Sequence, residues 1–493
     1  MRIPGGLLGL VLAGSLFAAD APRPSLVEVA KSGDKSALRD LLQKKVDANA
    51  TEADGTTALH WAAYRDDLES ADLLLRAGAK VNAASDLGAT PLWAASQNGS
   101  SAMVKKLLDA GANPNLALLS GETPLMVACR SGYPEAVELL IGKGANLNAH
   151  GTRGQTALMW AVAQQHADVV KVLIAHHVDL NLKSDSWTDV MAVPPHGYLP
   201  YNIAVPQGGE TALMFAARVG DLASAKLLIA AGANVNDADA WGVSAVTLAE
   251  HSGFTDLGLF LLDKGANPNA APNGFTALHE AIMRRDEKMV AALLDHKADA
   301  NTPLKQWTPT RRSSDDFHFE PSLVGATPFW LAARFDEPAI MRMLAAHGAD
   351  AKVVFHAQWV GEQGFGQTER SETSTALLAA TGYGGGTVKP WVEASKAEKE
   401  AQTLEAVKIA VELGVDVNAT GEGRTALDGA NALRYRSVID FLTSKGAKAG
   451  AGGGRGGRGG GRGAAGGRGG RGAAPGAASA DAPASDSPND EPK

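Results

Sequence analysis

The sequence predicts an all-α solenoid, in which short helix–turn–helix units stack one on the next. A Thr-x-Leu motif begins at Thr57, Thr90, Thr123 and Thr156, so that successive copies are 33 residues apart. The chain is 45% hydrophobic but only 5% aromatic, and it contains 56 glycines among 493 residues. This composition favours short helices and tight turns over one large sandwich core. A fixed period of this kind indicates a repeat array rather than the roughly three domains that length alone suggests.

The first half of each unit begins at the motif. The series resumes at Thr211, Ser244, Thr276, Thr327, Thr375 and Thr425. A threonine or serine hydroxyl can accept a hydrogen bond from the free N–H groups at a helix start. Pro91, Pro124 and Pro328 follow at the first helical position, where a missing N–H costs little. We therefore expect the first helix of each unit to start directly after this residue.

The second half of each unit ends in a Leu-Leu…Gly-Ala phrase, seen first at residues 73–82. Glycine ends a helix well because it adopts the left-handed conformation without strain. The phrase supplies this glycine at Gly78, Gly111, Gly144, Gly232, Gly265, Gly348, Gly414 and Gly446. His177 and Lys297 stand at the same position in two units, and we expect weaker turns there.

Together these phrases resemble the ankyrin repeat, whose pattern is Gly-x-Thr-Pro-Leu-His, two short helices and Leu-Leu-x-x-Gly-Ala-x-x-Asn. The resemblance covers residues 25 to about 447 and predicts about eleven repeats joined by β-hairpin-like finger loops. One repeat cannot bury its apolar face alone, whereas a stack forms a continuous core. The first repeat, 25–54, and the last, 425–447, are expected to act as caps within a domain spanning 22–449.

The period breaks at four insertions, near residues 184–208, 303–325, 353–373 and 382–403. The first three fall in finger loops. The fourth falls between the two helices of its own repeat, where residues 393–401 predict a helix extension. The insertions carry aromatic residues that the repeats mostly lack, among them Trp187, Tyr198, Trp307 and Trp359. These rings suit anchors for a protein partner, since aromatic residues dominate interface hot spots. The alternative is that they pack on one another and give each loop a small core.

The two ends of the chain differ from the array. Residues 1–21 contain a basic residue, an apolar run of about a dozen residues and small residues at a cleavage position, as in a signal peptide. We expect export to the periplasm or the outside of the cell, and no membrane-spanning segment once this peptide is removed. Residues 450–493 form a Gly/Arg-rich and then Ala/Pro/Ser/Asp tail, which we expect to be disordered.

The sequence carries no assembled catalytic or metal-binding constellation. Cys129 is the single cysteine, which excludes an intrachain disulfide and a multi-thiolate metal site. It aligns with Ala63, a small inward position, so we expect it to be buried. The net charge of −8 argues against nucleic acid as a partner of the body of the chain. We expect no enzyme activity, no cofactor and no metal.

The resemblance implies a non-catalytic scaffold that binds a protein on the face made by fingers and first helices, and we expect a monomer. Two alternatives stay open: RNA or anionic-surface binding through the Arg/Gly tail, and an enzyme site built in the insertions. Candidate partner-binding residues at matching repeat positions are Tyr64, Arg65, Gln97, Asn98, Arg130, Arg218, His251, Arg284 and Arg334. Candidates in the insertions are Trp187, Tyr198, Trp307 and Trp359.

Overall fold

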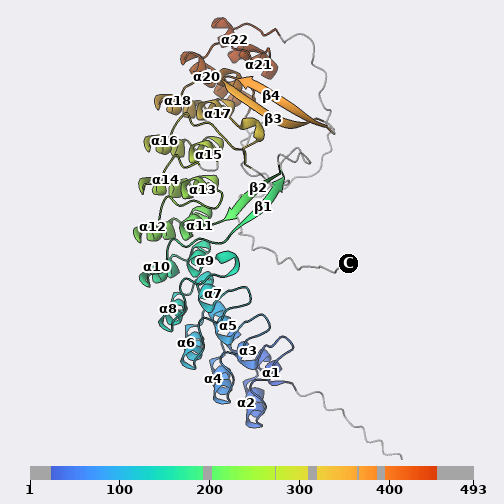
Figure 1. Ribbon diagram of the computed structural model, residues 1–493, viewed down its shortest axis with the longest axis vertical. Helices are drawn as coiled ribbons and strands as arrows, with labels where there is room; N and C mark the ends of the chain where they lie inside the picture. Colours follow the sequence, from blue (N-terminus) through green and yellow to red (C-terminus); the bar gives the residue numbers. More distant parts are fainter. Residues whose placement is uncertain are drawn as a thin grey trace, which may run out of the picture. The chain divides into compact units, whose positions relative to one another are not determined.

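The chain forms a stack of helix pairs, seen in a computed structural model (Figure 1). The structure describes residues 24–192, 202–271, 274–308, 319–363, 366–385 and 395–451. These ranges belong to one compact unit, Met1–Gly452. Within them lie 22 α-helices, which confirms the expected eleven repeats. The expected signal peptide and tail lie outside the described residues, apart from the short segment up to residue 451.

Each repeat pairs an odd-numbered helix with the following even-numbered helix. The odd helices are α1 Leu26–Ser32, α3 Ala58–Tyr64, α5 Pro91–Asn98, α7 Pro124–Ser131, α9 Ala157–Ala163, α11 Ala212–Val219, α13 Ala245–His251, α15 Ala277–Arg284, α17 Pro328–Arg334, α19 Ala376–Ala380 and α21 Ala426–Leu433. The even helices are α2 Lys35–Gln43, α4 Leu68–Arg76, α6 Ser101–Asp109, α8 Pro134–Gly142, α10 Ala167–Ala175, α12 Leu222–Ala230, α14 Thr255–Asp263, α16 Glu287–Asp295, α18 Pro338–Ala346, α20 Lys396–Glu412 and α22 Arg436–Ser444. A finger is here the loop from an even helix to the next odd helix.

The odd helices begin where the Thr motif predicts. The Thr90 hydroxyl accepts a hydrogen bond from the backbone N–H of Trp93, and Pro91 occupies the first helical position. Thr57 and Thr276 form capping boxes with a histidine three residues on, His60 and His279. Each cap fixes the direction in which a finger enters its helix, so the eleven odd helices share one orientation in the stack.

Asparagine side chains join consecutive repeats on the side of the fingers. The side chain of Asn82 donates to the Gly111 carbonyl at 3.1 Å and accepts from the Asn113 backbone N–H at 2.8 Å. The same two bonds link Asn49 to Gly78 and Lys80, Asn115 to Gly144 and Asn146, Asn236 to Gly265 and Asn267, Asn301 to Gly348 and Asp350, and Asn418 to Gly446 and Lys448. Lys352 stands at this position before α19, where an insertion also interrupts the period.

The core is a continuous layer of leucine and alanine between neighbouring repeats. Leu59, Leu92 and Leu125 are buried, as is the small residue Ala63 that lets adjacent helices approach closely. Cys129 is fully buried as expected, and burial raises the pKa of its thiol far above the ordinary value. A thiol held neutral in this way is a packing residue and not a nucleophile.

The glycines that end the even helices are left-handed. Gly111 and Gly144 have φ near +90°, and a Cβ at either position would meet nothing within 4 Å. His177, at the same position after α10, adopts φ +60°. A residue with a Cβ costs about 1–2 kcal/mol in this left-handed conformation. The difference between glycine and histidine at this position is therefore backbone strain, and not a clash with neighbouring atoms.

Replacing His177 with glycine is therefore expected to stabilise the array by about 0.5–1 kcal/mol, because relief of strain exceeds the extra chain entropy of glycine. Gly144→Ala is the matched control and should destabilise by a similar amount. Urea unfolding followed by circular dichroism measures both changes. If Gly144→Ala proves neutral, the left-handed turn does not limit stability at this position.

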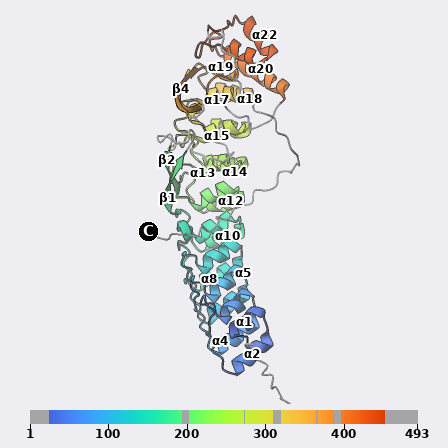
Figure 2. The ribbon, with the colours of Figure 1, turned by 90° about the vertical axis from the view of Figure 1, so that its right-hand side faces the viewer.

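Two finger insertions form β-hairpins. Strand β1, Ser186–Ala192, pairs antiparallel with β2, Asn202–Gly208, and β3, Phe355–Gln363, pairs with β4, Gly366–Ser374. Both hairpins lie on the side of the odd helices (Figures 1 and 2). The remaining finger insertion, 303–325, contains a short 3₁₀ turn, Pro321–Leu323, among its described residues. The fourth insertion adds turns to α20, which has 17 residues and begins at a Ser395–Glu398 capping box, as the expected helix extension requires.

Candidate functional site

The fingertips of the first five repeats are linked sideways by hydrogen bonds. Three of these links join backbone groups, and the fourth runs from the Thr152 hydroxyl to the Ser120 carbonyl at 3.3 Å. The N–H of Asp86 donates to the Asp54 carbonyl at 2.8 Å, and the N–H of Leu119 donates to the Leu87 carbonyl at 2.9 Å. The N–H of Asp185, just before β1, donates to the Arg153 carbonyl at 2.9 Å. We call the residues 54, 86–87, 118–120, 152–153 and strand β1 the fingertip row. These bonds hold the row as one ordered surface, although most of its side chains lie in solvent.

The fingertip row exposes large apolar side chains. The four most exposed such residues in the described chain are Leu119 at 80%, Val190 at 74%, Leu87 at 70% and Tyr64 at 52%. The first three belong to the row, and Tyr64 ends α3. Single exposed apolar residues are ordinary, but a group on one face indicates an interaction surface. The sequence alone did not single out Val190, which the structure shows to be an apolar residue on an exposed strand.

A stripe of rings and cations runs along the odd helices beside this row. Tyr64 meets Trp61 edge-on with 5.9 Å between the ring centroids, and the Lys31 ammonium lies 4.6 Å from the Trp61 ring. The Arg130 guanidinium lies 5.3 Å from the ring of Trp160. A cation over an aromatic face is attracted to the ring, which holds both side chains in place. The stripe thus consists of amphipathic side chains whose positions are fixed by these ring and cation contacts.

Two predicted arginines are tied to the finger that precedes their own helix. Arg130 makes an ion pair of 2.5 Å with Glu122, and Arg218 pairs with Glu210. Each glutamate stands directly before the Thr motif, and burial raises the pKa of Glu122. Nothing in the sequence singled out these two glutamates as partners of the arginines. The arginines are consequently pre-oriented side chains, held where finger and helix meet.

Other predicted residues at the ends of odd helices serve the stacking. The side chain of Asn98 donates to the Ala63 carbonyl at 3.2 Å, and Arg65 donates to the Lys31 carbonyl at 3.3 Å. Arg334 is half-buried and donates to the Gly384 carbonyl at 2.8 Å. Of the predicted repeat-position residues, Gln97 is exposed beside Asn98. Asn98, Arg65 and Arg334 thus contribute to inter-repeat or loop packing as well as to the surface.

The insertion aromatics divide between surface and core. Trp187 is 36% exposed, with the Arg153 guanidinium 4.8 Å from its ring. Trp307 is buried, which corrects the expectation that its ring is an anchor on the surface. Trp359 is half-buried against the core, and Tyr198 lies outside the described residues.

A buried acidic cluster joins α13 and α15. Glu250 is fully buried and Glu280 almost so, while His251 and Arg284 lie at the surface edge of the same junction. The Nδ1 of His251 lies 3.3 Å from Glu280, and the Nε of Arg284 lies 4.0 Å from Glu250. Burial raises the pKa of Glu250 to about 8. The predicted residues His251 and Arg284 thus belong to an internal electrostatic network.

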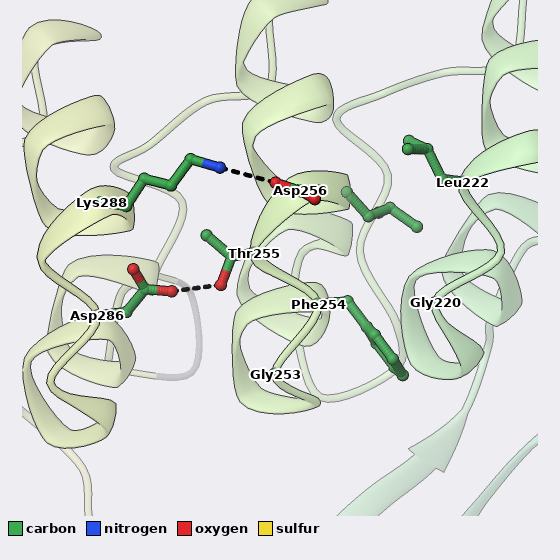
Figure 3. Close-up of a pocket in the computed structure, with 9 residues that line it drawn as sticks. Gly220, Leu222, Gly253, Phe254, Thr255, Asp256, Asp286 and Lys288 are labelled. Carbon is green, nitrogen blue, oxygen red and sulfur yellow. Dashed lines mark hydrogen bonds and ion pairs between the residues drawn. The ribbon is translucent and has the colours of Figure 1, made fainter. Parts of the chain in front are cut away.

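A polar pocket of about 500 Å³ lies at the turns that join odd to even helices in three successive repeats (Figure 3). Its charged groups already pair with one another: Lys288 with Asp256 at 2.8 Å, and the Thr255 hydroxyl with Asp286. Phe254 and Leu222 complete the lining. Lys288 and Asp256 neutralise one another, and Asp286 accepts a hydrogen bond from Thr255, so each charged group of the lining already has a partner.

Within the described ranges, no group of three or more His, Cys, Asp or Glu side chains is arranged to hold a metal ion. A search of the same residues finds no helix with the length and apolar character needed to span a bilayer.

A comparison with known protein families agrees with this architecture. The family described as Ankyrin repeats (3 copies) matches residues 26–117, 110–184 and 213–304, which together cover just over half of the chain. The Ankyrin repeat and KH domain-containing protein of Caenorhabditis briggsae is 30% identical over 253 residues. That alignment covers 48% of this chain and 8% of the relative. The crystal structure of the human ASB11 ankyrin repeat domain is 28% identical, with a TM-score of 0.41, covering 50% of this chain and 100% of that one.

The fold is that of a helical repeat protein whose units stack through capped helix pairs. The chain belongs to the ankyrin repeat family. Repeats of this family generally mediate protein–protein interaction.

Proposed function

We propose that this protein is a non-catalytic scaffold that binds a protein partner through the fingertip row and the adjoining stripe of odd-helix side chains. The observation that carries the proposal is that the three most exposed large apolar side chains of the described residues, Leu119, Val190 and Leu87, all belong to the fingertip row. Burying about 100 Å² of such surface against a partner contributes roughly 2–3 kcal/mol. The hydrogen bonds between neighbouring fingertips order this surface before the partner binds, so binding carries little further cost in conformational entropy.

Placing charged residues in the apolar fingertip row tests whether it binds the partner. The double substitution Leu87→Glu with Leu119→Glu is expected to weaken partner binding by at least about tenfold, because two apolar contacts are lost and two charges must be desolvated. The measurement is quantitative capture of cross-linked partners by the full chain, followed by affinity measurement on the recovered partner. Unfolding should be unaffected, since both side chains point into solvent.

Leu68→Glu is the matched control, because Leu68 is also exposed but begins α4 on the far side of its helix pair. It should leave capture unchanged. Equal capture by wild type and the double variant would contradict the proposed surface. Loss of capture by Leu68→Glu alone would move the interface to the even helices.

We further propose that the protein acts after export, on the basis of the apolar N-terminal run in residues 1–21. Fractionation of cells that make the full chain, with N-terminal sequencing of the recovered protein, tests this. A mature chain beginning near Pro22 in the exported fraction is the expected result. An intact Met1 in the cytosolic fraction would contradict it.

A further inference from the structure

The described side chains of strand β1 are exposed to solvent but mostly uncharged. Every residue from Ser186 to Val190 is exposed, and Asp189 is the single charged residue among them. Strand β4, the exposed strand of the other hairpin, presents Glu369 and Arg370 within its exposed stretch. Charged residues on an edge strand discourage other strands from pairing with it. The β4 edge is therefore guarded, whereas β1 has little protection.

Among the described residues, no backbone hydrogen bond reaches residues 186–192 except from β2. The chain enters β1 beside the Arg153 finger and leaves β2 beside the next finger, where the N–H of Ala240 donates to the Gly208 carbonyl at 2.9 Å. In a two-stranded sheet each strand keeps one unpaired edge. The free edge of β1 thus faces the shorter fingers that precede it. The β2 strand contains Pro206, which lacks an N–H, so β2 is the poorer template.

The two faces of β1 differ in chemistry. Trp187 and Asp189 share one face, since the indole N–H donates to the Asp189 carboxylate at 3.1 Å, and Arg153 stacks over the same ring. Val190 and Thr188 lie on the opposite face because side chains alternate along a strand. An added strand would therefore meet a carboxylate on one face and an apolar β-branched residue on the other.

We propose that the free edge of β1 receives an extended segment of a protein partner by strand addition, with a basic residue opposite Asp189 and a β-branched apolar residue opposite Val190. The inference rests on the proposed scaffold function and specifies how one part of the fingertip row engages its partner. Main-chain hydrogen bonds supply the affinity, and the alternating cross-strand pairs supply selectivity.

Charge argues against a second copy of this chain as the occupant. Asp189 is the central residue of Ser186–Ala192, so an antiparallel pair of two β1 strands in full register places one Asp189 opposite the other. Like charges directly opposite one another destabilise a strand pair. A segment with a central lysine or arginine replaces this repulsion with attraction.

The test uses the full chain and a capped heptapeptide, Thr-Val-Val-Lys-Thr-Val-Thr, whose lysine falls opposite Asp189 in antiparallel register. Binding is measured by fluorescence anisotropy of the labelled peptide, and hydrogen exchange reports on the amides of residues 186–192. The lysine peptide is expected to bind about fivefold tighter than a peptide with glutamate at its centre. The substitution Asp189→Lys should reverse this preference and leave the hairpin folded. A peptide with methylated backbone nitrogens should neither bind nor slow exchange.

Three results would overturn the inference. Equal binding of the methylated peptide would mean that side chains alone make the contact. An unchanged preference in Asp189→Lys would remove the assigned register. A dimer in sedimentation that dissociates on Val190→Lys would make a second copy the occupant. The double variant Leu87→Glu with Leu119→Glu should retain peptide binding, so failure of strand addition and failure of the proposed function are distinguished.

Discussion

Replacing Glu250 with glutamine is expected to stabilise the protein at pH 8 and to remove much of its loss of stability between acid and mild alkali. The Glu250 side chain is fully buried between α13 and α15, and among the described residues neither carboxylate oxygen accepts a hydrogen bond. Burial, assisted by the negative charge of Asp286, raises its pKa from 4.5 to about 8, despite Arg284 at 4.0 Å. Other repeats place Ala63, Cys129 and Ala217 at this position.

The sign of the pH dependence follows from proton counts. Between pH 4.5 and 8 the folded chain holds a proton on Glu250 and the unfolded chain does not. Stability therefore falls as pH rises through this range, by an amount on the order of 3–5 kcal/mol, and is level in this respect below and above it. The groups that face Glu250 are His251 on its own helix, and Glu280, Arg284 and Asp286 from the neighbouring repeat.

Urea unfolding at pH 5, 7 and 9 measures this effect, with hydrogen exchange locating it at the α13–α15 junction. Glu250→Gln keeps the shape of the side chain, and Glu250→Ala restores the small residue of other repeats. Both should reduce the slope of stability against pH. If both variants keep the slope of the wild type, Glu250 is ionised in the folded protein and Arg284 stabilises it.

Replacing Gly429 with alanine is expected to destabilise the protein by about 1–3 kcal/mol, although alanine is the better helix former. Gly429 lies inside α21, where a Cβ would stand 2.5 Å from the Thr381 carbonyl oxygen of the preceding repeat. Neither backbone can retreat without disturbing the stack, because Thr381 follows α19 directly and is buried. The overpacking therefore outweighs the gain in helix propensity.

Gly142→Ala provides the matched control. Gly142 ends α8, and a Cβ there would meet nothing within 4 Å. The same substitution should stabilise the protein by about 0.5–1 kcal/mol through the lower chain entropy of alanine. Opposite signs in urea unfolding are the expected result. Two stabilising substitutions would show that α19 and α21 can separate without cost.

The array itself could be predicted from the sequence because its signals are local. Each Thr motif marks a helix start, each Gly-Ala phrase marks a helix end, and both depend on interactions within a few residues. The 33-residue period then sets the number and order of repeats. The buried position of Cys129 followed from its alignment with Ala63, and the turns added to α20 followed from its charged, alanine-rich segment.

The tertiary structure alone decided what lies at the junctions and on the fingertips. Glu250 resembles any helical glutamate in sequence, and only the packing of α15 over α13 removes it from water. Trp307 and Trp187 look alike as insertion aromatics, yet one is buried and the other half open. The insertions have no period, so their paths depend on contacts with neighbouring repeats rather than on local pattern. Burial and charge pairing between repeats arise only when the stack forms, which is why the sequence specified the scaffold and the structure specified its surface.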